Sequence, residues 1–410
     1  MDKVNPGDTA WVLLSASLVM LMTPALGFFY GGLVRRKNVL STLMHSFFML
    51  ALIGVQWVLW GYSLAFGPDL RGLIGNLDWV ALEGVGFLPN PDYAPTIPHQ
   101  AFMAYQMMFA VITPALITGA FAERKRFKAF VLFSLLWATF VYDPVAHWVW
   151  GNGGILRQLG AVDFAGGIVV HVSSGVSALV AALMLGRRLG FGHESMDPHD
   201  ATMTLLGAGL LWFGWFGFNA GSALGANGLA VNAFVVTNTA AAMGALTWMT
   251  VSWAHQRQPS VVGIGLGAVA GLATITPAAG FVNARAAILI GMLAGMVCYW
   301  AVQLLKARLG IDDALDVFGV HGVGGAMGAI ATGVFATTAV NSGGVNGLLY
   351  GNPAQLAIQT GAVLVVGLYA GAVSWLILKL IDVTIGLRVE EGEEMLGLDT
   401  SQHGEAAYKI

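Results

Sequence analysis

Long apolar stretches follow one another along almost the whole chain, and short polar connections separate them. A helix needs about 20 mostly apolar residues to cross a bilayer core. Unbroken apolar character over such lengths is typical of spanning helices. The pattern predicts eleven spans, near residues 9–33, 40–66, 99–121, 127–148, 165–186, 201–219, 228–253, 261–278, 285–305, 317–338 and 355–381.

Basic residues gather in alternate connections, and this asymmetry predicts an orientation. Cytoplasmic connections of membrane proteins carry an excess of Lys and Arg. The connections after the odd-numbered spans hold Arg35, Arg36, Lys37, Arg124, Lys125, Arg126, Lys128, Arg187, Arg188, Arg257, Lys306 and Arg308, and the others only Arg71, Arg157 and Arg285. We therefore expect the N-terminus outside and the tail in the cytoplasm.

Composition supports a membrane protein and excludes several other classes. Hydrophobic residues make up 57% of the chain and charged residues 10%, with a mean hydropathy of +0.72, whereas soluble domains carry about 25% charged residues. A net charge of -3 gives no sign of a nucleic-acid partner, and the single Cys298 excludes an internal disulfide framework. The short polar start "MDKVNPGDTA" and the long first span do not resemble a cleaved signal peptide.

Two sequence echoes predict an internal repeat. "TPALITG" lies in the third span and "TPAAGFV" in the eighth, while His171 lies in the fifth and His321 in the tenth. Both pairs are five spans apart, and a unit with an odd number of spans must repeat in inverted orientation, as in many transporters. Recurrence by chance is the alternative. The expected plan is a membrane domain over 1–384, with repeats over about 9–187 and 200–338 and a last helix over 355–383, followed by a cytoplasmic tail over 385–410.

The two histidines are the first candidates for chemistry. Ionisable groups inside spans usually face a cavity or each other, and repeat symmetry would bring these two together as a neutral pair. Packing against a backbone carbonyl is the alternative for either ring. Small residues lie three and four positions on, where they share a helix face with the histidine: Ser174, Gly175, Gly324 and Gly325. Neither segment has Asp or Glu at ligand spacing, so no metal site is expected.

Two acidic residues each precede a span that holds a histidine. Asp163 and Asp316 can both cap a helix N-terminus, and capping is the preferred interpretation for Asp316. For Asp163, a cap and a role in attracting cations are compatible. The aromatic residues Phe109, Trp150 and Phe218 can pack against lipid or offer a face to a cation, and composition alone does not separate these roles.

Five motifs in order resemble the ammonium transporters of the Amt/Mep/Rh family. They are "DFAGGIVVH", "WFGFNAGS", "GLATITPAAG", "DVFGVHGVGG" and "GLDTSQHGEAAY". The resemblance covers nearly the whole chain and is to the bacterial Amt branch, because the chain has the Trp of "WVWG" and the Ser of "FNAGS". It implies an all-α integral membrane protein of eleven transmembrane helices, two inverted five-helix repeats plus a final helix, assembled as a homotrimer with one pore per subunit.

The resemblance also implies roles for individual residues. Asp163 would help to recruit and deprotonate ammonium. Tyr105 departs from the family pattern, which often has Phe there. By position, the ammonium-binding residues would be Phe109, Trp150 and Ser222, the gate Phe109 and Phe218, and the pore lining His171, His321 and Thr276.

Partners and location follow from the same resemblance. The tail resembles the regulatory tail that docks with neighbouring subunits and with PII signal proteins, and the location would be the inner (plasma) membrane. No cofactor is expected, and no paired nucleophile or metal-ligand set points to an enzyme. The alternative function is an ammonium sensor that conducts little, although the tail is too short for an appended signalling domain. Whether ammonia moves alone or with a relayed proton stays open.

Overall fold

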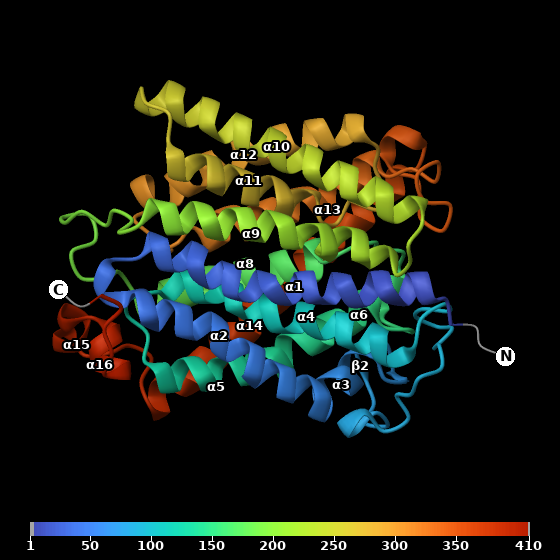
Figure 1. The fold of residues 1–410 in the computed structure, drawn as a ribbon, viewed down its shortest axis with the longest axis horizontal. Helices are drawn as coiled ribbons and strands as arrows, with labels where there is room; N and C mark the ends of the chain where they lie inside the picture. The colour runs from blue at the N-terminus through green and yellow to red at the C-terminus, as the bar shows by residue number, and fades with distance from the viewer. Residues whose placement is uncertain (1–3, 409–410) are drawn as a thin grey trace.

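The computed structural model describes residues 4–408 and forms a bundle of long helices that run side by side (Figure 1). The longer helices are α1 (Pro6–Leu33), α2 (Val39–Gln56), α4 (His99–Ile117), α5 (Phe127–Trp137), α6 (Asp143–Trp150), α8 (Ser173–Leu185), α9 (Ala201–Ala220), α10 (Gly228–Gln256), α11 (Val261–Ile275), α12 (Ala284–Gln303), α13 (Val323–Phe335) and α14 (Pro353–Thr384). Shorter elements are α3 (Tyr62–Phe66), α7 (Ile155–Gln158), α15 (Glu391–Leu396), α16 (Leu398–His403), β1 (Asp69–Leu70) and β2 (Ile74–Gly75). The ends of the expected membrane domain and tail, residues 1–3 and 409–410, lie outside the described residues.

The helices agree with a protein that crosses the membrane many times. Within residues 4–408, 10 helical segments are long and apolar enough to span, and α11 is a shorter apolar helix of 15 residues. All eleven predicted spans fall on these segments, but α11 ends at Ile275 and the chain then turns. The chain is a multi-pass, mostly helical membrane protein, and the count of eleven spans stays a prediction.

Two π-helical turns interrupt the bundle where the histidines lie. The turn η6 (Gly167–Val172) contains His171 and leads into α8, and the turn η9 (Phe318–Gly322) contains His321 and leads into α13. Each turn packs against the helix that follows the other turn. Such π-bulges are rare and often occur at functional sites.

Glycines let these two segments cross almost backbone to backbone. A β-carbon on Gly175 would lie 2.2 Å from the backbone nitrogen of Gly322, and one on Gly325 would lie 2.6 Å from the β-carbon of His171. Real β-carbons do not approach other atoms this closely, so larger residues would force the segments apart. The small residues that follow each histidine therefore allow the two segments to approach closely.

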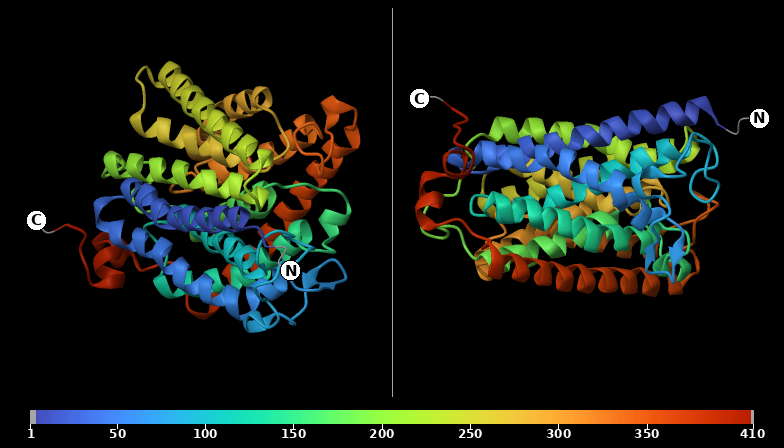
Figure 2. Two further views of the ribbon diagram at one scale, coloured as in Figure 1. Left: turned by 45° about the vertical axis from the view of Figure 1, so that its right-hand side comes forward. Right: turned by 90° about the horizontal axis from the view of Figure 1, so that it is seen from below.

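A second pair of spans five apart also lies side by side. α1 and α9 pack along their lengths, and a β-carbon on Gly207 of α9 would lie 2.3 Å from the backbone nitrogen of Phe29. Figure 2 shows the two chain ends at opposite ends of the bundle, as an odd number of crossings requires.

Candidate functional site

An aromatic pocket opens at the end of the bundle near the N-terminus. This cavity of ≈ 280 Å³ is lined by residues that include Phe109, Trp150, Asp163 and Ser222. Phe109 belongs to α4, Trp150 ends α6, and Ser222 follows α9. The ring centroids of Phe109 and Trp150 are 6.0 Å apart with an interplanar angle of 87°. Four residues that the sequence suggested for binding therefore share one pocket.

Hydrogen bonds hold the polar groups of the aromatic pocket in place. The Trp150 indole donates to the Asp163 carbonyl at 2.8 Å, and the Ser222 hydroxyl donates to the Phe218 carbonyl at 2.9 Å. The Tyr105 hydroxyl lies 3.1 Å from the Ser222 oxygen and 2.8 Å from the Gly217 carbonyl. The residue that departs from the family pattern thus helps to fix the serine, a role that the sequence did not suggest.

The Asp163 carboxylate caps the π-helical turn of His171. Its two oxygens accept four backbone N–H groups, from Gly166, Gly167, Ile168 and Val169, at 2.7–3.0 Å. Donors to a carboxylate stabilise its ionised form. The capping interpretation is confirmed, and the same residue lines the aromatic pocket. Burial raises the pKa of its carboxyl group, and the four backbone N–H donors act in the opposite direction.

The Phe109 ring, which lines the aromatic pocket, packs against the Phe218 ring on the side toward the two histidines. The centroids of the two phenyl rings are only 4.3 Å apart, and both side chains are buried. The Phe218 ring in turn stacks near His171, with 6.1 Å between centroids and an interplanar angle of 19°. Passage from the pocket toward the histidines would therefore require these two phenyl rings to move.

The histidines meet beneath the phenyl rings. Their Nδ1 atoms lie 3.2 Å apart, and their rings are inclined by 22°. In a neutral pair, one Nδ1–H donates to the other Nδ1, so the two Nε2 atoms offer one acceptor and one donor. The His171 Nε2 is buried without a hydrogen-bond partner in the described structure. It is free to meet a small polar molecule.

The cavity beside the two rings is narrow and apolar. It measures ≈ 10 Å³, about the space for one water-sized molecule. Apart from the histidines, its walls are aliphatic or aromatic: Met22, Leu26, Ile112, Leu116, Val170, Leu211, Trp215, Phe218 and Val269. We call this space the histidine cavity. Among residues 4–408, no three His, Cys, Asp or Glu side chains gather as a metal site would need.

Thr276 lines neither of these cavities. Its buried hydroxyl accepts the Trp215 indole N–H at 2.9 Å and donates to the Leu272 carbonyl at 2.7 Å. Trp215 stacks near His171, with 5.6 Å between ring centroids. Thr276 therefore supports the wall of the histidine cavity through Trp215, which the sequence analysis missed. Trp215 lies three residues before Phe218 on one helix face, and this spacing was the available signal.

The cap expected at Asp316 belongs to Asp313. The Asp313 carboxylate accepts the Phe318 N–H at 2.7 Å, whereas Asp316 pairs with Lys306 at 2.6 Å. Asp316 has a positive φ of 63°, so the chain turns there and places the earlier carboxylate at the helix start. Burial, together with the nearby Asp316 charge, raises the pKa of Asp313 to about 6.

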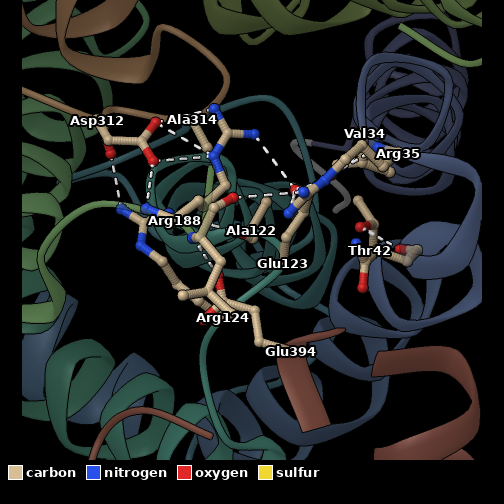
Figure 3. A network of polar contacts seen from close by, with 12 residues as sticks. Val34, Arg35, Thr42, Ala122, Glu123, Arg124, Arg188, Asp312, Ala314 and Glu394 are labelled. Carbon is tan, nitrogen blue, oxygen red and sulfur yellow. Dashed lines mark hydrogen bonds and ion pairs between the residues drawn. The ribbon is translucent and has the colours of Figure 1, made fainter. Parts of the chain in front are cut away.

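Charged residues at the opposite end of the bundle form a buried network (Figure 3). Arg188 makes a paired contact with Asp312, with Nη2–Oδ1 and Nε–Oδ2 distances of 2.8 and 2.9 Å, and its Nη1 lies 3.5 Å from Glu123. Glu123 also binds Arg35 at 2.7 Å, and Arg124 donates to the Asp312 carbonyl at 2.7 Å. The network joins the connections after spans one, three, five and nine.

The tail packs onto the same connections. Glu394 of α15 binds Arg388 at 2.7 Å and accepts the Leu189 N–H at 2.7 Å. Lys37 donates to the Glu394 and Met395 carbonyls at 3.0 and 2.7 Å. The tail is thus docked on basic connections, at the end of the bundle opposite the N-terminal end of α1 (Figure 2).

Comparison with known proteins decides the family. The model of the Ammonium Transporter Family matches residues 10–408. The chain belongs to the ammonium transporter family. It is 54% identical to the ammonium transporter of Bacillus subtilis over 98% of each chain. Candida albicans Mep2 superposes with a TM-score of 0.91 at 38% identity, covering 99% of this chain and 91% of that one.

A third relative bears on the alternative function. A solved structure titled "Sensor Amt Protein" matches with a TM-score of 0.90 at 28% identity, covering 97% of this chain and 98% of that one. The family and the Bacillus subtilis relative are named as transporters rather than enzymes, which agrees with a non-enzymatic reading of this chain.

Proposed function

We propose that this chain transports ammonium, binding the cation in the aromatic pocket, deprotonating it there and conducting ammonia past the two histidines. The main support is that three features follow one another: an aromatic pocket with a buried carboxylate, two closely packed phenyl rings as a gate, and a dry cavity with two imidazoles. Ammonia can pass such a path as a neutral molecule, while the histidines offer it polar contacts or relay a proton.

The same alignment explains selection against potassium. Ammonium and potassium have similar size and charge, but only ammonium donates hydrogen bonds and can lose a proton. Aromatic faces attract either cation, whereas a narrow apolar cavity leaves the desolvation of a bare ion uncompensated. Deprotonation before the histidine cavity then admits ammonia and rejects potassium.

The binding site is tested by changing two of its contacts. We expect Trp150→Leu with Ser222→Ala to weaken ammonium affinity or selectivity, because a cation–π contact contributes about 0.5–2 kcal/mol. The measurement is the concentration dependence of ammonium and potassium currents from purified protein in liposomes. Trp253→Leu removes a Trp that is 52% exposed and is the matched control. If the double variant keeps the wild-type affinity and selectivity, Trp150 and Ser222 do not form the ammonium-binding site.

Asp163 is tested separately. Asp163→Ala should abolish transport, because it removes both the negative charge in the pocket and the cap on the turn that carries His171. Asp163→Glu keeps the charge and is expected to retain some current. Subunit assembly is checked by size-exclusion chromatography. Normal transport in a correctly assembled alanine variant would leave the residue as a cap alone.

Assembly and orientation complete the proposal. We infer a homotrimer of eleven-span subunits built from two inverted repeats, in the inner (plasma) membrane, with the aromatic pocket outside and the tail in the cytoplasm. The basic connections that gather at the tail end support this orientation. An apolar hollow of ≈ 580 Å³, lined by Trp11 and by residues of α10 that include Val231 and Phe234, is a surface suited to a neighbouring subunit.

The docked tail supports regulation by a PII-type signal protein at the cytoplasmic face. We expect such a protein to block the pore from the cytoplasm and to copurify under nitrogen-replete conditions. Removing residues 385–410 should abolish both its binding and its effect on current, because the tail supplies part of its docking surface. If the shortened chain assembles correctly and the PII-type protein binds and inhibits it as well as the full chain, the tail is not part of the docking surface.

An ammonium sensor with little conduction is the second candidate, supported by the similarity to the sensor protein named above. The two functions differ in current. An ammonium pulse applied to liposomes on a solid-supported membrane, followed by a potassium pulse, gives a selective current for an electrogenic transporter. A parallel assay of internal pH detects electroneutral ammonia movement, so silence in both assays would favour the sensor.

A further inference from the structure

A small hairpin packs against the helix that ends at Trp150. The hairpin pairs β1 with β2, and Asp69 lies opposite Gly75. The Leu73 carbonyl accepts the Trp148 indole N–H at 2.7 Å, and the Gly72 carbonyl accepts the Ile155 N–H at 3.0 Å. These contacts lie before and after Trp150 in the chain, so the hairpin holds both sides of that residue.

A buried histidine makes the third link. The His147 side chain on α6 is 0% exposed, and its Nε2 lies 2.9 Å from the Asp69 Oδ1. Its Nδ1 lies 3.0 Å from the Ala65 carbonyl. Each of these oxygens can accept a hydrogen bond from an imidazole N–H. Asp69 also accepts the Gly72 N–H at 2.7 Å, which fixes the hairpin turn.

Glycines after Trp150 allow the chain to pack closely against Asp69 and His147. A β-carbon on Gly151 would lie 2.6 Å from the His147 Nδ1, and one on Gly153 would lie 2.7 Å from the β-carbon of Asp69. Gly153 also has a positive φ of 93°, which favours glycine. The "HWVWGNGG" segment therefore packs tightly against the Asp69–His147 pair. Trp150 lies in the chain between His147 and the two glycines that make these contacts.

We propose that the Asp69–His147 pair, with its hairpin, is a positioning element that sets the orientation of Trp150 and thereby the affinity for the cation. Neither residue of the pair touches the substrate in this proposal, which rests on the proposed role of Trp150 in binding. A cation–π contact needs the cation within about 6 Å of the ring centroid. A small shift of the α6 end therefore weakens binding while leaving the histidine cavity intact.

Asp69→Asn tests the pair with almost no change in size. We expect the KM for ammonium to rise about 3- to 10-fold, as loss of one cation–π contact would produce. The maximal current should stay within about twofold, because the change affects binding more than passage. Asp78→Asn is the matched control: it removes an exposed carboxylate from the same connection, and its side chain binds Asn76 rather than α6. It should leave the KM unchanged.

A second background separates positioning from general damage. In the Trp150→Leu protein, the effect of Asp69→Asn on the KM should disappear, because there is no ring to position. An equal effect in both backgrounds, or a loss of maximal current alone, would overturn the proposal. If Trp150→Leu has no effect on the KM, the proposed binding site fails. In that case a raised KM in Asp69→Asn shows that the pair acts by another route, which also overturns the positioning role.

Trp148→Phe provides a gentler variant in case Asp69→Asn fails to assemble. It removes the indole N–H that binds Leu73 and keeps an aromatic ring near Tyr369, whose centroid lies 4.6 Å away. We expect a smaller rise in the KM, again only when Trp150 is present. An unchanged KM in this variant, with intact assembly, would count against the hairpin as a positioning element.

Discussion

Replacing Asp312 by alanine is expected to destabilise the folded protein by about 3–5 kcal/mol, because it leaves a buried guanidinium without its carboxylate. The Asp312 side chain is 0% exposed and that of Arg188 is 4% exposed. The same carboxylate also accepts the Arg188 backbone N–H at 2.8 Å. Thermal unfolding of the purified protein in detergent, followed by loss of the assembled peak in chromatography, measures the effect.

Two further variants show whether the effect comes from a buried charge. Asp382→Ala is the control for an exposed ion pair. The Asp382 side chain is 46% exposed and lies 3.9 Å from Lys379. Exposed pairs contribute about 0–1 kcal/mol, so this variant should change stability little. Replacing both Asp312 and Arg188, by leucine and methionine, should recover part of the loss, since no charge is then stranded. A double variant as unstable as Asp312→Ala would contradict this account.

Low pH is expected to weaken the Asp312–Arg188 pair and so to lower the stability of the protein. Burial alone would raise the pKa of Asp312, but hydrogen bonds and charge from Arg188 hold that pKa below its ordinary value. A carboxyl group with a lowered folded pKa stabilises the protein fully above its unfolded pKa of about 3.9 and loses this contribution as pH falls through the folded value. The Asp312→Asn variant should lack this part of the acid destabilisation.

The fold was predictable from the sequence because each span is a local feature. Apolar length located the spans, and the five-span offset between His171 and His321 indicated that the two segments meet. Helix ends were harder, because a turn with positive φ at Asp316 moved the cap to Asp313. Capping rules consider the residue next to the helix and do not describe the path of the chain before it.

Contacts between distant segments were not predictable in the same way. Thr276 and Trp215 meet through a hydrogen bond between two spans, and no periodicity or spacing marks such a pair. Arg188 served as an orientation signal in the sequence, yet it is only 5% exposed. Its burial depends on Asp312 and Glu123, which lie more than 60 residues away on either side, and on the tail that covers the same connections.

Alanine at either His171 or His321 is expected to reduce ammonium current by at least about tenfold, to abolish selectivity over potassium, or to do both. In the structure, the two Nδ1 atoms lie 3.2 Å apart. Removing one ring leaves the Nδ1 of the other ring without this hydrogen-bond partner. It also enlarges a cavity of ≈ 10 Å³, and water or hydrated ions can then enter. His171→Ala and His321→Ala should therefore both fail, although they lie in different halves of the chain.

An acidic replacement at one position separates the need for a ring from the need for a hydrogen bond. His171→Glu can still bond the remaining imidazole through its carboxyl group, so we expect it to keep some conduction where His171→Ala does not. His193→Ala, which changes an exposed histidine in a connection, is the control for loss of an imidazole. Ammonium and potassium currents are compared in all variants at equal amounts of assembled protein. Wild-type currents and selectivity in both alanine variants would make the histidines packing residues, because a proton relay between the two rings needs both of them.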